Sequence, residues 1–249
     1  MDKMIETKER SIKVVTHNQD KLTVVKHNNL NSASYHLPLD ARRLIISAIS
    51  KIHSKDKKVP DEIEIHSDEF AQQWGLKPNN AYKQLKDARE KLYNDTVRTK
   101  RLDTGEVWDV RWLDAAAYQD GKGYIKLSFS ERIKPYLSDL QSHFTSYRLN
   151  EVRNFKSTHA IRIYELLMQF KDTGWYQVEV QELKHMLDVS DKYKRWAEFR
   201  RNVVELAVKE INKQSTFDVS AEYLRKGRSI KYIRFTVSKK PQTDMFYGE

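Results

Sequence analysis

Residues 191–212, DKYKRWAEFRRNVVELAVKEIN, decide the fold, because their large apolar side chains recur at the spacing of a helix. Side chains three or four positions apart lie on one face of an α-helix, so the pattern predicts a helix over residues 193–212 with one buried stripe. The stripe consists of Trp196, Phe199, Val203, Ala207 and Ile211. The other face is cationic at its beginning, where Glu198 is the single acidic residue against five basic ones between 192 and 201.

Short elements surround this helix. Ser157 is a good helix N-cap, and the residues after it predict an amphipathic helix up to Phe170. A strand over residues 175–180, a short helix over 181–187 and a turn over 188–191 precede the long helix. Alternating apolar residues after it predict a hairpin whose tip is Lys226-Gly227-Arg228. This order is the winged-helix arrangement, in which a helix-turn-helix is followed by a β-hairpin wing.

The same order occurs earlier in the chain. Helical periodicity covers residues 40–53, a short strand precedes a helix over 67–74, and a longer helix ends near Asn94. The runs 96–102 and 106–113 predict a hairpin, followed by a strand over 124–129 and a closing helix over 130–140. We therefore expect an α+β, helix-rich fold of two tandem winged-helix domains.

The expected domain limits follow from these patterns. Residues 1–28 are predicted to form a tail with at most a short strand at 22–25, and ordered structure is expected to begin near Leu37. One winged helix occupies 29–140, a linker 141–156 and the other winged helix 157–240. Residues 241–249 form a second tail.

Several classes of protein are disfavoured by composition. The 249 residues include no Cys and 7 Gly, and none of those glycines has the spacing of a phosphate-binding loop. The eight His are scattered without a metal-binding motif, so we expect no catalytic residue, no metal and no cofactor. No apolar run is long enough to span a membrane and no export signal is evident, so we expect a cytoplasmic, non-enzymatic protein.

The charge distribution indicates a polyanionic partner. The net charge is +10, and residues 192–240 alone hold 14 basic and 5 acidic residues, an excess of nine. The second helix of a helix-turn-helix enters the major groove, where Arg can bond guanine and Lys more often holds phosphate. We expect Arg201 and Arg195 to contact bases. The predicted double-stranded DNA contacts of the second domain are Lys192, Lys194, Arg195, Arg200, Arg201, Arg225, Lys226, Arg228 and Lys231.

The first domain is close to neutral, with 19 basic and 17 acidic residues between 29 and 140, so its DNA contacts should be weaker. Its candidates are Lys83, Lys86, Arg98 and Lys100. An ordinary solvated surface, or an assembly surface, is at least as good an interpretation here. A solvated helix face is also the alternative for residues 192–201.

Four segments carry a resemblance to a known family. They are FTSYRL at 144–149, STHAIRIYELL at 157–167, LDARRLI at 39–45 and WAEFRR at 196–201. Over about residues 30–240 the chain resembles the initiator replication proteins of iteron-containing bacterial plasmids. The resemblance implies two winged-helix domains, whose monomers bind repeated origin sites (iterons) and help to open the duplex, and whose dimers repress their own gene at an operator. It also implies that monomers and homodimers are in equilibrium.

By the same resemblance, the C-terminal domain makes the main DNA contacts and the N-terminal domain supports dimerisation and secondary contacts. Host replication initiator protein and replicative helicase would be the partners. DNA contact is carried onto Lys194, Arg195, Arg200 and Arg201, whereas the matching residues Arg162, Tyr164 and Glu165 are assigned mainly to packing and the domain junction, with phosphate contact a minor alternative for Arg162.

Three alternatives remain open. The first is a winged-helix transcriptional repressor without initiator activity, which would use a similar DNA surface. The second is a replication enzyme such as a nickase or primase. The third is binding of the basic, aromatic-rich helix to an anionic membrane surface.

Overall fold

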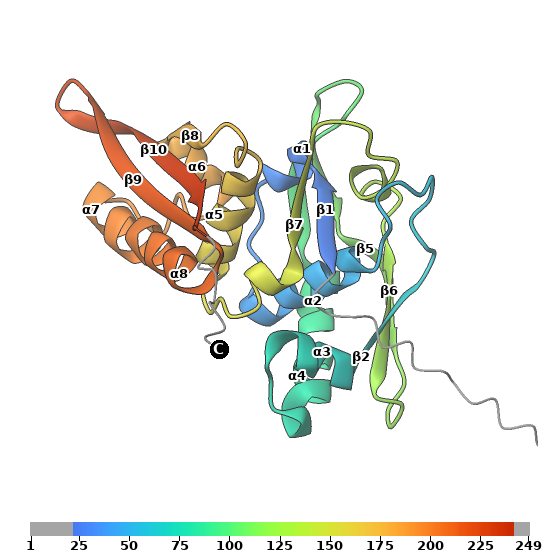
Figure 1. Ribbon diagram of the computed structural model, residues 1–249. Coiled ribbons are helices and arrows are strands. Elements are labelled where there is room, and N and C mark those ends of the chain that lie inside the picture. Colours follow the sequence, from blue (N-terminus) through green and yellow to red (C-terminus); the bar gives the residue numbers. More distant parts are fainter. Residues whose placement is uncertain (1–21, 242–249) are drawn as a thin grey trace, which may run out of the picture.

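Helices and strands occur in the predicted order twice in the computed structural model, which describes residues 22–241 (Figure 1). The first winged helix contains α2 (Leu39–Ser50), β2 (Ile63–His66), α3 (Ser67–Trp74), α4 (Pro78–Asn94) and a hairpin of β3 (Thr96–Lys100) and β4 (Val107–Arg111). The second contains α5 (Thr158–Met168), β8 (Trp175–Glu179), α6 (Val180–Met186), α7 (Trp196–Phe199), α8 (Leu206–Gln214), β9 (Phe217–Lys226) and β10 (Ser229–Lys239). The α+β, tandem winged-helix prediction is confirmed.

The first winged helix has an additional sheet. β5 (Leu113–Tyr118) and β6 (Tyr124–Phe129) form it with β2, in the order β2-β6-β5. The closing helix expected over residues 130–140 is wrong, because only the short 3₁₀ turn η2 (Lys134–Tyr136) forms there. Pro135 has no N–H to donate to the preceding turn, and Asp139 has a left-handed φ of 53°, so a regular helix does not extend over residues 130–140.

A sheet stands where the sequence predicted a linker and a tail, the tail with a short strand over residues 22–25 that β1 largely matches. β1 (Thr23–His27) pairs antiparallel with β7 (Phe144–Arg148), and Figure 1 shows both strands in the middle of the molecule, between the winged helices. α1 (Asn28–Asn31) follows β1 and the 3₁₀ turn η3 (Leu149–Glu151) follows β7. Ordered structure therefore begins before residue 28, and the expectation of a start near Leu37 is wrong. The rest of the two predicted tails, residues 1–21 and 242–249, lies outside the described residues.

The long helix of the second winged helix begins later than predicted. Its apolar stripe is buried from Phe199 to Ile211, as expected, but the helix begins at Trp196 and not at Tyr193. The amides of Lys192 and Tyr193 both donate to Val189 O, which closes a turn instead. The middle of the helix, η4 (Arg200–Glu205), is π-helical. We call α7, η4 and α8 together the recognition helix.

Candidate nucleic-acid interface

The recognition helix begins beside the wing of the second winged helix. The Trp196 and Tyr223 rings, from the helix and from β9, meet edge to face with centroids 5.1 Å apart. Lys184 of α6 fixes the approach to this helix, because its Nζ donates to Tyr193 O at 2.6 Å. Figure 1 shows the hairpin of β9 and β10 extending past the start of the helix. The start of the recognition helix and the wing therefore lie side by side.

Five predicted DNA contacts have free charges. All five side chains are exposed, and within residues 22–241 none of them forms an ion pair or a cation–π contact. They are Lys194 and Arg201 at the recognition helix, and Arg225, Lys226 and Arg228 at the wing. Because an exposed cation without a carboxylate partner keeps its full attraction for phosphate, these five side chains give the second winged helix a positive surface. We call them the free cations.

Other predicted contacts in the second winged helix have partners. Arg200 Nε lies 3.2 Å from Glu205 Oε1, and Lys231 Nζ lies 2.6 Å from Glu179 Oε2. The hydrogen bond from Lys231 to Glu179 raises the pKa of that lysine. The Arg195 side chain is 83% exposed, and its Nη1 lies as far as 4.0 Å from Glu198 Oε1. Its charge is therefore only weakly compensated. Lys192, which is exposed, lies over the ring of its neighbour Tyr193 at 5.4 Å.

Two of the four candidates in the first winged helix are neutralised. Arg98 forms two hydrogen bonds to Asp109, at 2.8 and 3.0 Å, across the β3–β4 hairpin. Lys86 lies 3.1 Å from Asp120 and 3.9 Å from the Tyr118 ring. The other two candidates, Lys83 and Lys100, are exposed, and the described part of the chain gives neither an ion pair.

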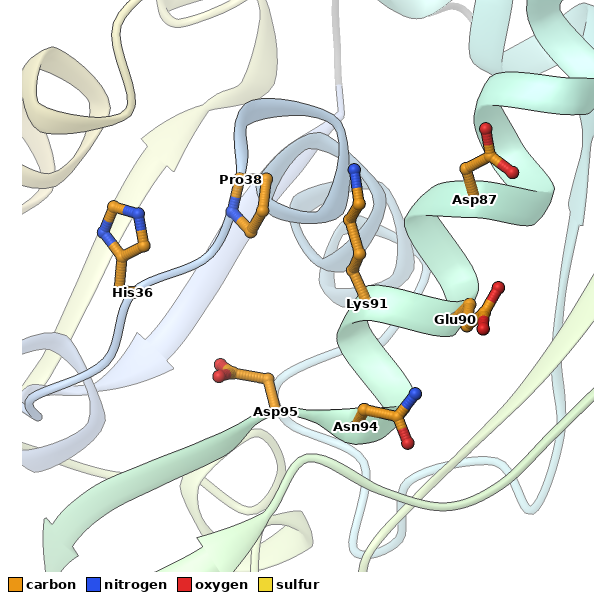
Figure 2. A pocket seen from close by; sticks show the side chains of 7 residues that line it. All are labelled: His36, Pro38, Asp87, Glu90, Lys91, Asn94 and Asp95. Atoms are coloured by element: carbon orange, nitrogen blue, oxygen red, sulfur yellow. The ribbon is translucent and has the colours of Figure 1, made fainter.

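Acidic side chains lie on the exposed face of α4. Figure 2 shows a pocket between the end of α4 and the segment before α2, lined by His36, Pro38, Asp87, Glu90, Lys91, Asn94 and Asp95. Burial raises the pKa of Asp95 to about 6, but Asp87 and Glu90 are exposed. Three carboxylates around one pocket disfavour a polyanion at that pocket.

Two residues at the interface were missed by the sequence analysis. Lys184 is 3% exposed, and burial lowers its pKa; no sequence signal distinguishes one lysine on a short helix from its neighbours. Asn202 is exposed beside Arg201 on the recognition helix, and an amide side chain is suited to adenine. Its residue type and its position next to the arginines were the available signal.

A buried ionic cluster joins the two winged helices. Glu165 of α5 lies 2.7 Å from Lys26 Nζ of β1 and 3.3 Å from Arg162 Nη1, and Tyr147 of β7 donates to it at 2.7 Å. Burial alone would raise the pKa of Glu165, but Lys26 and Arg162 lower it to about 2. Arg162 and Glu165 are both 1% exposed, and Tyr164 between them is buried, as the assignment to packing and to the domain junction predicted.

Within the described residues 22–241, no helix is both long enough and apolar enough to cross a membrane. Within the same residues, His, Asp and Glu side chains form no group that could hold a metal ion.

Known proteins share this architecture. Residues 23–168 match the family described as "Initiator Replication protein, WH1", and residues 179–237 match "Initiator Rep protein, WH2". The chain is 26% identical over 252 residues to the PI protein of Escherichia coli. This match covers 87% of this chain and 83% of that protein. A Replication initiation protein of Escherichia coli is 25% identical over 233 residues, covering 90% of this chain and 72% of that protein.

A solved structure covers nearly the whole fold. The crystal structure of Pi initiator protein in complex with iteron DNA superimposes with a TM-score of 0.77 at 25% sequence identity. The match covers 89% of this chain and 99% of that one.

Proposed function

Because this chain belongs to the family of initiator replication proteins, we propose that it binds the repeated sites of a plasmid origin and initiates replication there. The observation that carries the proposal is the set of free cations on the recognition helix and wing of a fold that matches the Pi initiator bound to iteron DNA. The family is one of DNA-binding initiators, and a nickase or primase activity is not part of the proposal.

Each half of the interface has a different task. A recognition helix in the major groove can read base edges, and Arg201 and Asn202 on its exposed face have the side chains for guanine and adenine. The wing cations grip the adjacent backbone, where they supply affinity without sequence preference. The first winged helix makes fewer phosphate contacts, through Lys83 and Lys100, and supports dimerisation.

Paired variants test this division. Arg201→Ala should cost about 1–3 kcal/mol of binding free energy at one base position and relax the preference there. Lys226→Ala should weaken iteron and scrambled duplexes alike and reduce the salt slope of log K by about 1. Titrations at several salt concentrations measure both effects. Lys122→Ala, an exposed lysine in the turn before β6, is the matched control. Equal, sequence-independent losses from both variants would contradict the assignment.

Initiation goes beyond DNA binding. We propose that the monomer opens the origin and recruits the host replication initiator protein and the replicative helicase, while the dimer represses its own gene. A supercoiled origin plasmid probed for unpaired thymines with and without the protein tests opening. Protection of an inverted repeat alone, with no unpaired thymines, would favour the repressor alternative. Incubation of the plasmid with protein, Mg²⁺ and nucleotides should yield neither a nick nor a primer.

A further inference from the structure

Residues 31–36 form a strap that contacts both winged helices. Ser34 exchanges two backbone hydrogen bonds with Arg98 of β3, both 2.9 Å long. Its hydroxyl donates in the other direction, to His185 O at 2.7 Å, near the end of α6. One residue thus ties the hairpin of the first winged helix to the helix-turn-helix of the second.

Two carbonyl groups at the end of α6 accept hydrogen bonds from residues outside the helix-turn-helix of the second winged helix. Carbonyl groups in the final turn of a helix have no partner further along that helix. His185 O accepts the Ser34 hydroxyl in addition to the Asp188 amide, and Met186 O accepts Arg162 Nη2 at 3.4 Å. Arg162 is itself held by the strap, because Asn31 O and Ala33 O accept its guanidinium at 2.9 and 2.8 Å.

The end of α6 in turn positions the start of the recognition helix. Lys184, one residue before His185, donates to Tyr193 O at 2.6 Å. Val189 closes the turn by accepting the amides of Lys192 and Tyr193. Lys194 and the N-cap residue Arg195 follow directly. A displacement of the last turn of α6 would therefore reach the cations that face DNA.

We propose that Ser34 is a positioning residue for DNA reading: through His185 it holds α6, and through α6 it sets the angle at which the recognition helix presents Arg201. Sequence discrimination by the second winged helix then depends on a side chain that belongs to the first. This inference rests on the proposed function, since it assigns to that same surface the element that orients it.

Ser34→Ala tests the inference, because it removes the hydroxyl and leaves the backbone bonds to Arg98 in place. The readout is the dissociation constant for a mismatched duplex divided by that for an iteron. The mismatch is placed at the base pair that Arg201 reads, which is the position where the Arg201→Ala variant loses its preference. Ser34→Ala should lower this ratio about threefold to tenfold, the equivalent of one hydrogen bond, with an unchanged salt slope. Ser34→Thr, which keeps a hydroxyl, should restore the ratio.

Ser32→Ala is the matched control, since Ser32 lies on the same strap and is exposed. It should leave the ratio unchanged. Melting curves of all three variants establish that each is folded at the assay temperature. An unchanged ratio in Ser34→Ala, or an equal loss of affinity for both duplexes, would overturn the positioning role while leaving the proposed function intact. A wild-type protein without any preference for the iteron would instead overturn the proposed function.

Discussion

His159 and Asp95 are partly buried groups whose protonation changes the stability of the folded state in opposite directions: it destabilises the fold at His159 and stabilises it at Asp95. Burial, with a smaller contribution from His36, lowers the pKa of His159 from 6.5 to about 4. Its contribution to stability is present above pH 6.5 and is lost as the pH falls towards 4. Burial raises the pKa of Asp95 from 3.8 to about 6, so its contribution is present below pH 3.8 and is lost as the pH rises through 6.

Single variants should therefore separate the two pH dependences of the free energy of unfolding. Between pH 6.5 and 4, the free energy of unfolding of His159→Gln relative to wild type should increase as the pH falls, by at most about 1.4 kcal/mol per pH unit. For Asp95→Asn the same difference should increase as the pH rises from 4 to 6. Urea denaturation at a series of pH values measures both. Parallel curves for wild type and either variant would refute the corresponding pKa shift.

Among the predicted DNA contacts, residue type and position could be predicted from sequence, whereas pairing could not. Arg98 and Arg201 are both exposed guanidinium groups in a winged helix, yet Asp109 neutralises the first and no carboxylate reaches the second within the described chain. The hairpin register places Arg98 opposite Asp109, and a prediction of the strands without their register misses this. Whether a cation is free or paired depends on which side chains lie next to it, and this is known only from the tertiary structure.

At the level of elements, the amphipathic helices were the most predictable. Apolar residues that recur every three to four positions predicted α5 and the body of the recognition helix. Ser157 was correctly predicted as the N-cap of α5. The beginning of the recognition helix was predicted three residues too early, and the contact of its approach with Lys184, a buried side chain of another helix, has no signal in the sequence. Basic residues before Trp196 also disfavour an earlier start, since cations interact poorly with a helix N-terminus.

The cap of α5 gives a prediction at this scale. Ser157 Oγ accepts the Ala160 amide at 3.3 Å, so Ser157→Ala should lower the free energy of unfolding by about 1 kcal/mol. Ser157→Asp should preserve most of the stability, because a carboxylate can accept the same amide. Urea denaturation measures both, with Ser190→Ala in the exposed turn after α6 as control. Equal stability of wild type and Ser157→Ala would mean that Glu210, which also accepts the Ser157 amide, is enough to hold the helix start.

At the scale of the whole molecule, the strand pairing at the junction was the part that sequence patterns missed. β1 and β7 are five-residue strands about 120 positions apart, and a short alternation carries no information about so distant a partner. Lys26 is buried in that sheet because Glu165 of α5 neutralises it. The segments predicted as a tail and a linker therefore form the seam between the two winged helices.

This seam should make the molecule unfold as one unit. Lys26 of β1 lies far along the chain from Arg162 and Glu165 of α5, and all three side chains are nearly inaccessible to water. Glu165→Gln would leave two buried cations without a carboxylate, at a cost of about 3–5 kcal/mol in the free energy of unfolding.

Since that loss falls on the contacts between the winged helices, calorimetry should show one transition for wild type and two for Glu165→Gln. Glu179→Gln removes the exposed partner of Lys231 and is the control, expected to cost less than about 1 kcal/mol and to keep the single transition. Two transitions in wild type, or one undiminished transition in Glu165→Gln, would place the cooperativity of folding elsewhere than in the ionic cluster, and would reduce that cluster to a local packing feature of α5.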